Sequence, residues 1–92
     1  MTKLRSNEVK SALAQVPLWK RFGAIIRRTF ELPDFSAAMK FVNAVARLAE
    51  KAGHHPDIDI RWNRVTLALT THDAGGLTAK DFGLAARLDR LA

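Results

Sequence analysis

Residues 58–70 alternate between apolar and polar side chains, and this alternation constrains the fold more than any other feature of the sequence. A period of two predicts β-strands with one face toward a core, because successive side chains point to opposite faces of a strand. The polar pair Asn63-Arg64 interrupts the pattern and predicts a turn, so the stretch indicates a β-hairpin. Its expected inward-facing residues are Ile58, Ile60, Trp62, Val65, Leu67 and Leu69.

Residues 19–32 predict a second hairpin upstream of the first. Gly23 is the expected turn between two extended segments, 19–22 and 24–32. In the second of these segments the apolar side chains again recur at even spacing, which predicts one buried face. The residues expected on that face are Ile26, Phe30 and Leu32.

One helix is expected before the two hairpins and another after them. The first covers residues 6–16, with Ser6 as its N-cap and Pro17 at its end. The last begins after Thr78, which has the spacing to form a capping box with Asp81. This capping box is enough to explain Asp81 as a structural residue.

A longer helix is expected between the hairpins, from a cap at Asp34 or Ser36 to about Ala52, with Gly53 as its stop. The resulting order, α-β-β-α-β-β-α, predicts a single α+β domain over residues 1–92. We expect a four-stranded antiparallel sheet with the helices packed on one face. The apolar stripe expected to face the core from the long helix is Phe35, Ala38, Met39, Val42, Val45, Ala46 and Ala49.

The net charge of +6 lies entirely in the first thirty residues, which carry seven basic residues against one acidic residue. A solvated face is the simplest interpretation, although a basic surface can also attract an acidic partner or an anionic ligand. The sequence has no cysteine, which excludes disulfides and thiolate chemistry. We expect a cytoplasmic protein without membrane or nucleic-acid partners, because the sequence shows no signal segment, membrane span or recognised nucleic-acid motif.

All three histidines belong to two short segments, His54-His55-Pro56 between the long helix and a strand, and His72 after the second hairpin. Histidine exchanges protons near neutrality, since its unperturbed pKa is about 6.5. Their grouping favours a proton-transfer site over histidines that are merely structural. A zinc site is disfavoured because the sequence has no His-Glu-x-x-His pair and no cysteine. A serine triad is disfavoured because there is no Gly-x-Ser-x-Gly.

The spacing of typed residues around the histidines resembles that of the pterin-4a-carbinolamine dehydratase family. The resemblance extends from about Trp19 to the C-terminus and includes the segments 28–35 and 71–78. Its most specific part is the series Glu50, His54-His55-Pro56, Trp62, His72 and Asp81 at fixed gaps.

The resemblance implies dehydration of a 4a-hydroxytetrahydropterin to the quinonoid dihydropterin, which recycles the cofactor of aromatic amino acid hydroxylases. This reaction needs no metal or redox cofactor. It needs an acid to protonate the leaving hydroxyl at C4a and a base to take the N5 proton, and two imidazoles can supply both.

The resemblance also implies that His54, His55 and His72 form the catalytic group. We expect His54 and His72 to transfer protons and His55 to position the ligand, with either imidazole of the pair as the acid. Three further residues are expected at the substrate. Glu50 would hydrogen-bond the pterin or hold a histidine tautomer, Pro56 would fix the backbone, and Trp62 would stack on the heterocycle.

The family resemblance further implies a homodimer or homotetramer, and the row Leu84, Leu88 and Leu91 is either its interface or part of the intrachain core. An alternative function is a non-catalytic dimerisation or regulatory binding module that uses the basic N-terminal third. Some animal relatives serve as dimerisation partners of a homeodomain transcription factor, which keeps this alternative open.

Overall fold

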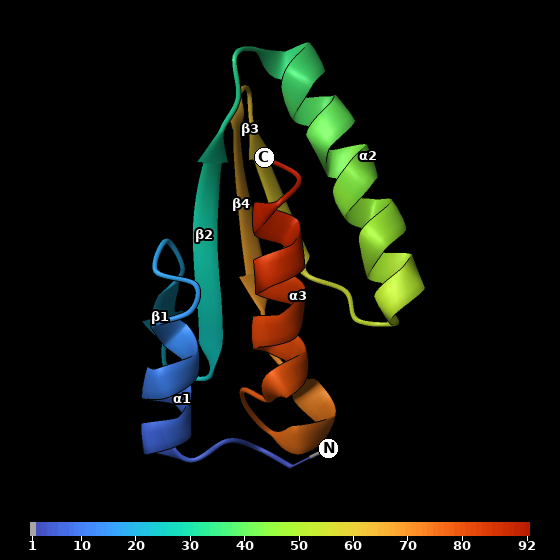
Figure 1. The fold of residues 1–92 in the computed structure, drawn as a ribbon. Helices are drawn as coiled ribbons and strands as arrows, with labels where there is room; N and C mark the ends of the chain where they lie inside the picture. Colours follow the sequence, from blue (N-terminus) through green and yellow to red (C-terminus); the bar gives the residue numbers. More distant parts are fainter. Residues whose placement is uncertain (1) are drawn as a thin grey trace.

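The computed structural model describes residues 2–92 and confirms the expected α+β fold (Figure 1). The three helices lie on one face of a four-stranded antiparallel sheet. No helix in residues 2–92 is long and apolar enough to cross a membrane. The elements in chain order are α1 (Ser6–Leu13), β1 (Lys20–Phe22), β2 (Ile25–Glu31), α2 (Phe35–Ala52), β3 (Asp57–Arg61), β4 (Arg64–Leu69), the short 3-10 helix η1 (His72–Ala74) and α3 (Ala79–Asp89).

The strand order is β1-β2-β4-β3, so the two hairpins meet through β2 and β4 at the centre of the sheet. In this central pair Phe30 is opposite Val65, and Ile26 is opposite Leu69. These apolar side chains are almost completely buried, because they point toward the helices. The alternation seen in the sequence therefore marks the core-facing side of β2 and β4. It is wrong about burial in β3, an edge strand whose residues are all exposed, with Ile58 at 39% and Ile60 at 37%.

The turn of the second hairpin lies at Trp62-Asn63, one residue earlier than the sequence pattern predicts. Trp62 adopts a left-handed backbone conformation with φ 52°, and two-thirds of its surface is exposed. The Asn63 side-chain amide donates a hydrogen bond to the carbonyl of Leu32, 2.9 Å away. This bond ties the turn to the end of β2, which explains why a polar Asn occupies it.

Helix α1 is shorter than expected and ends at Leu13. Its N-cap is Arg5 and not Ser6, and the Glu8 carboxylate accepts a hydrogen bond from the Arg5 backbone N–H at 2.8 Å. The chain then makes irregular turns that bury Val16 and Trp19 beneath it. Val16 keeps the helical spacing from buried Val9 although α1 ends before it, whereas Trp19 is a core residue that no helical period could have placed.

Helix α2 is capped by Asp34, as expected, and ends at Gly53 in the left-handed conformation with φ 64°. Its buried face differs from the predicted stripe, since the side chains with the least exposure are Ala38, Phe41, Val45 and Ala49. The rest of the predicted stripe lies on a neighbouring face that is only partly covered. That second row is Phe35, Met39, Val42 and Ala46, with Phe35 half exposed.

Helix α3 begins with the predicted capping box between Thr78 and Asp81. Leu84 and Leu88 are buried against the rest of the chain, which assigns them to the intrachain core. Leu91 lies past the end of the helix and is partly exposed. The row of three leucines is therefore not a free interface in this fold.

Candidate functional site

His54 and His55 follow the C-terminal end of α2, where Gly53 turns the chain out of the helix. A residue with positive φ at this position is needed for the turn, and glycine adopts it without steric cost. The backbone N–H of His54 still donates to the carbonyl of Ala49 at 3.2 Å. The histidine pair is therefore presented from the end of a rigid helix.

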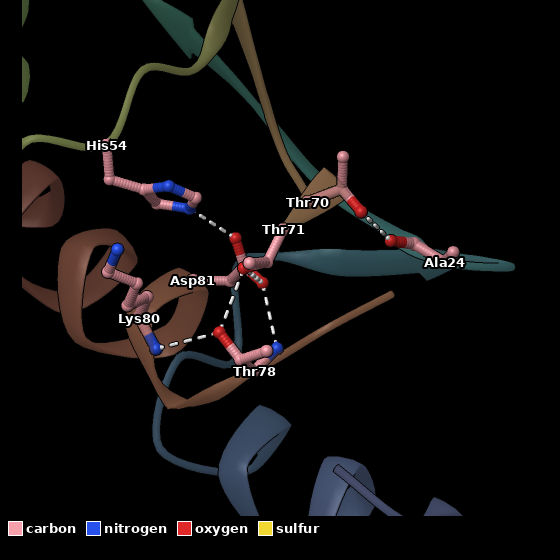
Figure 2. A network of polar contacts seen from close by, with 7 residues as sticks. All are labelled: Ala24, His54, Thr70, Thr71, Thr78, Lys80 and Asp81. Carbon is pink, nitrogen blue, oxygen red and sulfur yellow. Dashed lines mark hydrogen bonds and ion pairs between the residues drawn. The ribbon is translucent and has the colours of Figure 1, made fainter. Parts of the chain in front are cut away.

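The His54 ring is hydrogen-bonded to Asp81 on α3. Its Nε2 lies 2.6 Å from Oδ1 of Asp81, and only 12% of the His54 side chain is exposed. The Asp81 side chain has no exposed surface. Figure 2 shows the imidazole and the carboxylate facing each other between the α2–β3 connection and the start of α3.

The second carboxylate oxygen of Asp81 is held by two donors. The hydroxyl of Thr71 donates to Oδ2 at 2.8 Å, and the backbone N–H of Thr78 donates to the same oxygen at 2.9 Å. Thr71 and Thr78 also share a hydroxyl contact of 2.8 Å (Figure 2). A buried carboxylate is costly unless its oxygens are hydrogen-bonded, and here both are.

This network defines what the His54 ring can do chemically. Because Nε2 faces a carboxylate, it is the nitrogen that carries a proton in the neutral ring. Nδ1 is then left with its lone pair and can accept a proton from a ligand, with Asp81 stabilising the resulting imidazolium. The capping box therefore explains only part of Asp81, whose other oxygen orients a histidine.

His55 pairs with Glu50 near the end of α2, at 2.5 Å between Nε2 and Oε2. Both side chains are mostly exposed, at 63% for His55 and 76% for Glu50. Solvent screens such a pair, so its contribution to folding is small. Two roles were expected for Glu50, and its contact with His55 is the one that holding a histidine tautomer requires.

The loop after β4 carries His72 as the first residue of η1. Backbone hydrogen bonds between Thr71 and Gly76, 3.2 and 3.3 Å long, close this loop, and Gly75 adopts φ 74°. Leu77, which follows the loop, is held by Leu4, whose backbone N–H donates a hydrogen bond to the Leu77 carbonyl at 2.8 Å. The exposed His72 side chain therefore extends from a loop that is pinned at both ends.

A hollow of about 260 Å³ brings the three histidines together. This volume is slightly below the usual range for small-molecule sites, which suits a compact ligand that stays partly exposed. Within residues 2–92, the histidines and carboxylates form no cluster of three or more that could hold a metal ion. The residues lining the hollow are Gly53, His54, His55, Thr70, Thr71, His72, Asp73 and Lys80.

None of the three expected substrate residues lines this hollow. Glu50 reaches it only through His55, and Pro56 connects His55 to β3. Trp62 lies at the opposite end of β4 from His72. The six residues of β4 separate them by about 20 Å at the usual rise per residue.

Sequence reasoning missed the contact between Asp81 and His54, and it also missed Thr71. Sequence periodicity does not reveal that Thr71 is buried at the end of a strand, nor that the capping residue Asp81 has a second partner. The one signal in the sequence is the fixed gap from His72 to Asp81, but the capping box alone is enough to account for an acidic residue at position 81.

Comparison with known proteins decides the family. The sequence profile described as Pterin 4 alpha carbinolamine dehydratase matches residues 2–91. The chain belongs to this family. A Chloroflexus aurantiacus relative, provisionally named a pterin-4-alpha-carbinolamine dehydratase, is 60% identical over 91 residues, with 99% of this chain and 98% of the relative covered.

Two solved structures of the pterin dehydratase type share the fold. The crystal structure of a transcriptional coactivator/pterin dehydratase from Brucella melitensis matches with a TM-score of 0.94 and 33% identity, covering 99% of both chains. A pterin dehydratase-like protein identified as a RuBisCO assembly factor in the alpha-carboxysome matches with a TM-score of 0.67 and 25% identity. That match covers 80% of this chain and 86% of the other.

Proposed function

We propose that this protein dehydrates a 4a-hydroxytetrahydropterin to the quinonoid dihydropterin and water. The observation that carries the proposal is the buried His54–Asp81 pair at the edge of a hollow that His55 and His72 also line. Membership of the pterin dehydratase family and the names of the relatives support the same reaction. After a separate two-electron reduction to the tetrahydropterin, the product would serve again as the cofactor of an aromatic amino acid hydroxylase.

In the proposed reaction His54 and His72 exchange protons with the substrate. One imidazolium protonates the C4a hydroxyl, the C4a–O bond breaks, and water leaves. The other imidazole takes the proton from N5, whose electron pair forms the C4a–N5 double bond. Asp81 suits His54 to either role, because a carboxylate at Nε2 stabilises the protonated ring and orients the neutral one.

The remaining expected residues would act on binding. His55, held by Glu50, would position the pterin, and Pro56 would restrict the backbone behind it. Trp62 lies too far from the hollow to stack on a ligand bound by the same chain. Its proposed stacking role therefore requires a Trp62 supplied by a neighbouring subunit.

A homodimer or homotetramer remains our proposal for the assembly, with the outer row of α2 as its contact. Phe35, Met39, Val42 and Ala46 form a partly exposed apolar row at helical spacing, which is typical of a surface that packs against another helix. Replacing the exposed Ala46 with Lys should convert the assembly to monomers in light scattering. An unchanged mass would contradict the choice of this row.

The decisive test of the reaction is stopped-flow absorbance of freshly generated 4a-hydroxytetrahydropterin. We expect the protein to accelerate its decay, and we expect His54→Ala and His72→Ala each to reduce that acceleration by about 10²–10⁴-fold. Arg47→Ala, on the exposed side of α2, is a control that removes a charge elsewhere. Circular dichroism would verify that each variant is folded.

The second candidate function is a binding module without catalysis. It is favoured by the basic first thirty residues and by the two solved relatives, described as a transcriptional coactivator/pterin dehydratase and as a RuBisCO assembly factor. A folded protein that leaves the decay of the hydroxypterin unchanged would support this alternative and reject the enzyme. Its binding should then respond to Arg21→Glu and not to His54→Ala.

A further inference from the structure

A second hollow, of about 440 Å³, lies at the β1 edge of the sheet and shares no residue with the histidine hollow. It forms where β1 ends, since β1 pairs only with residues 25–27 of β2. The edge of β2 beyond Arg27 is left without a strand neighbour on that side. The residues lining it are Leu18, Lys20, Phe22, Arg27, Arg28, Thr29 and Thr66.

Two cations of this hollow are placed directly opposite each other. Lys20 on β1 pairs in register with Arg27 on β2, and cross-strand neighbours of like charge are destabilising. Neither residue forms an ion pair with a carboxylate in the part of the chain that the structure describes. This unfavourable arrangement would be relieved by an anion bound between the two side chains.

Three other cations of the sheet, Arg28, Arg61 and Arg64, are neutralised by carboxylates of the protein itself. Arg28 reaches Asp89 at 2.6 Å, and Arg64 on β4 reaches Glu31 at 2.8 Å. No carboxylate lines the hollow, and Asp59 of β3, which is opposite the lining residue Thr66, is paired with Arg61 at 3.2 Å. The positive charge of Lys20 and Arg27 is therefore available to a ligand.

The rest of the lining has both polar and apolar parts. The Arg27 guanidinium lies 4.1 Å from the centre of the Phe22 ring, a cation–π contact that holds it at the β1 edge of the sheet. The hydroxyls of Thr29 and Thr66 are 2.8 Å apart, so one donates to the other and a single O–H remains for a ligand. Leu18 and Phe22 add exposed apolar surface, at 62% and 49%.

We propose that this hollow binds a small phosphate ester. The phosphate lies between Lys20 and Arg27 and accepts the free hydroxyl hydrogen of the Thr29–Thr66 pair. The organic part of the ligand packs on Leu18 and the exposed edge of Phe22. Paired cations with several donors are the usual means of holding phosphate, and arginine is especially suited to it. The site is independent of the proposed dehydratase reaction, because the two hollows share no residue.

The test is isothermal titration of the full chain with ATP, adenosine and inorganic phosphate at low ionic strength. We expect ATP to bind, phosphate to bind more weakly, and adenosine not to bind. Lys20→Gln/Arg27→Gln should weaken ATP binding at least tenfold. Amide NMR shifts on titration with ATP should cluster in residues 18–29 and leave His54 and His72 unmoved.

The matched control is Lys40→Gln/Arg47→Gln, which removes the same charge from two exposed cations on α2 that do not line the hollow. This control should change ATP affinity less than twofold. An equal loss in both double variants would overturn the site in favour of general charge attraction. Absence of ATP binding, equal affinity for ATP and phosphate, or tighter binding of an oligonucleotide than of ATP would each overturn the proposed ligand class.

Discussion

His54 Nε2 lies 2.6 Å from Oδ1 of Asp81, and the two residues are 27 positions apart in the sequence. The contact joins the end of α2 to the first turn of α3 (Figure 2). It lies at the edge of the hollow that the other two histidines also line. Asp81 thus performs two functions at once, because Oδ2 completes a helix cap while Oδ1 orients an imidazole. Losing the contact at Oδ1 should therefore lower the rate of the proposed reaction, and losing the contacts at Oδ2 should lower the free energy of unfolding.

Asp81→Asn should reduce kcat/KM of the proposed dehydration by about 10²–10⁴-fold. If the amide oxygen keeps the bond from Thr78, the amide NH₂ faces His54 and favours the tautomer with its proton on Nδ1. That tautomer presents a donor where His54 would need a lone pair to act as the base, and the variant also removes the carboxylate that would stabilise the protonated ring if His54 were the acid. The measurement is stopped-flow kinetics, with Asp57→Asn on exposed β3 as the control that should keep its rate.

Thr71→Val should destabilise the fold by about 1–3 kcal/mol, because it removes the hydroxyl that donates to Asp81 and contacts Thr78 in a buried site. Urea unfolding followed by circular dichroism measures the change. Thr66→Val is the matched control, since Thr66 is less buried and should stay within about 0.5 kcal/mol of the parent. Equal effects at both positions would contradict a special role for the Thr71 hydroxyl.

Glu50→Gln should leave the free energy of unfolding within about 1 kcal/mol, because the pair with His55 is exposed to solvent. If Glu50 positions His55 for the pterin, the variant should raise KM more than it lowers kcat. Steady-state kinetics would separate the two parameters. A fall in kcat with KM unchanged would instead assign Glu50 to the chemical step.

Gly53→Ala should destabilise the protein by about 1–2 kcal/mol, since an L-residue is strained at φ 64°. The added methyl group meets no atom within 4 Å, so strain and not collision is the cause. Gly83→Ala is the contrasting variant, because its Cβ also meets nothing and it lies inside α3. Thermal unfolding should show a loss for the first and a gain or no change for the second.

The element order and the two hairpins were predictable, because periods of two and of 3.6 residues report directly on which side of an element is buried. The predictions were wrong where the local sequence allows two similar arrangements, such as two apolar faces of one helix or two positions for one turn. Helix α2 carries apolar side chains on two neighbouring faces, and only its packing on the sheet selects Phe41 over Phe35 for the core. The turn at Trp62 was shifted by one residue because the Asn63 side chain bonds to Leu32, a neighbour 31 residues away in the sequence.

By itself, the sequence determined the α+β architecture, the position of three histidines at the ends of regular elements, and the family pattern that relates them. The tertiary structure decided which side chains those histidines meet. Asp81 reaches His54, and Thr71 reaches Asp81, only because α2, β4 and α3 converge at one end of the sheet. Trp62 is carried to the other end by the same strands. Such contacts depend on how distant segments pack, which local periodicity does not encode.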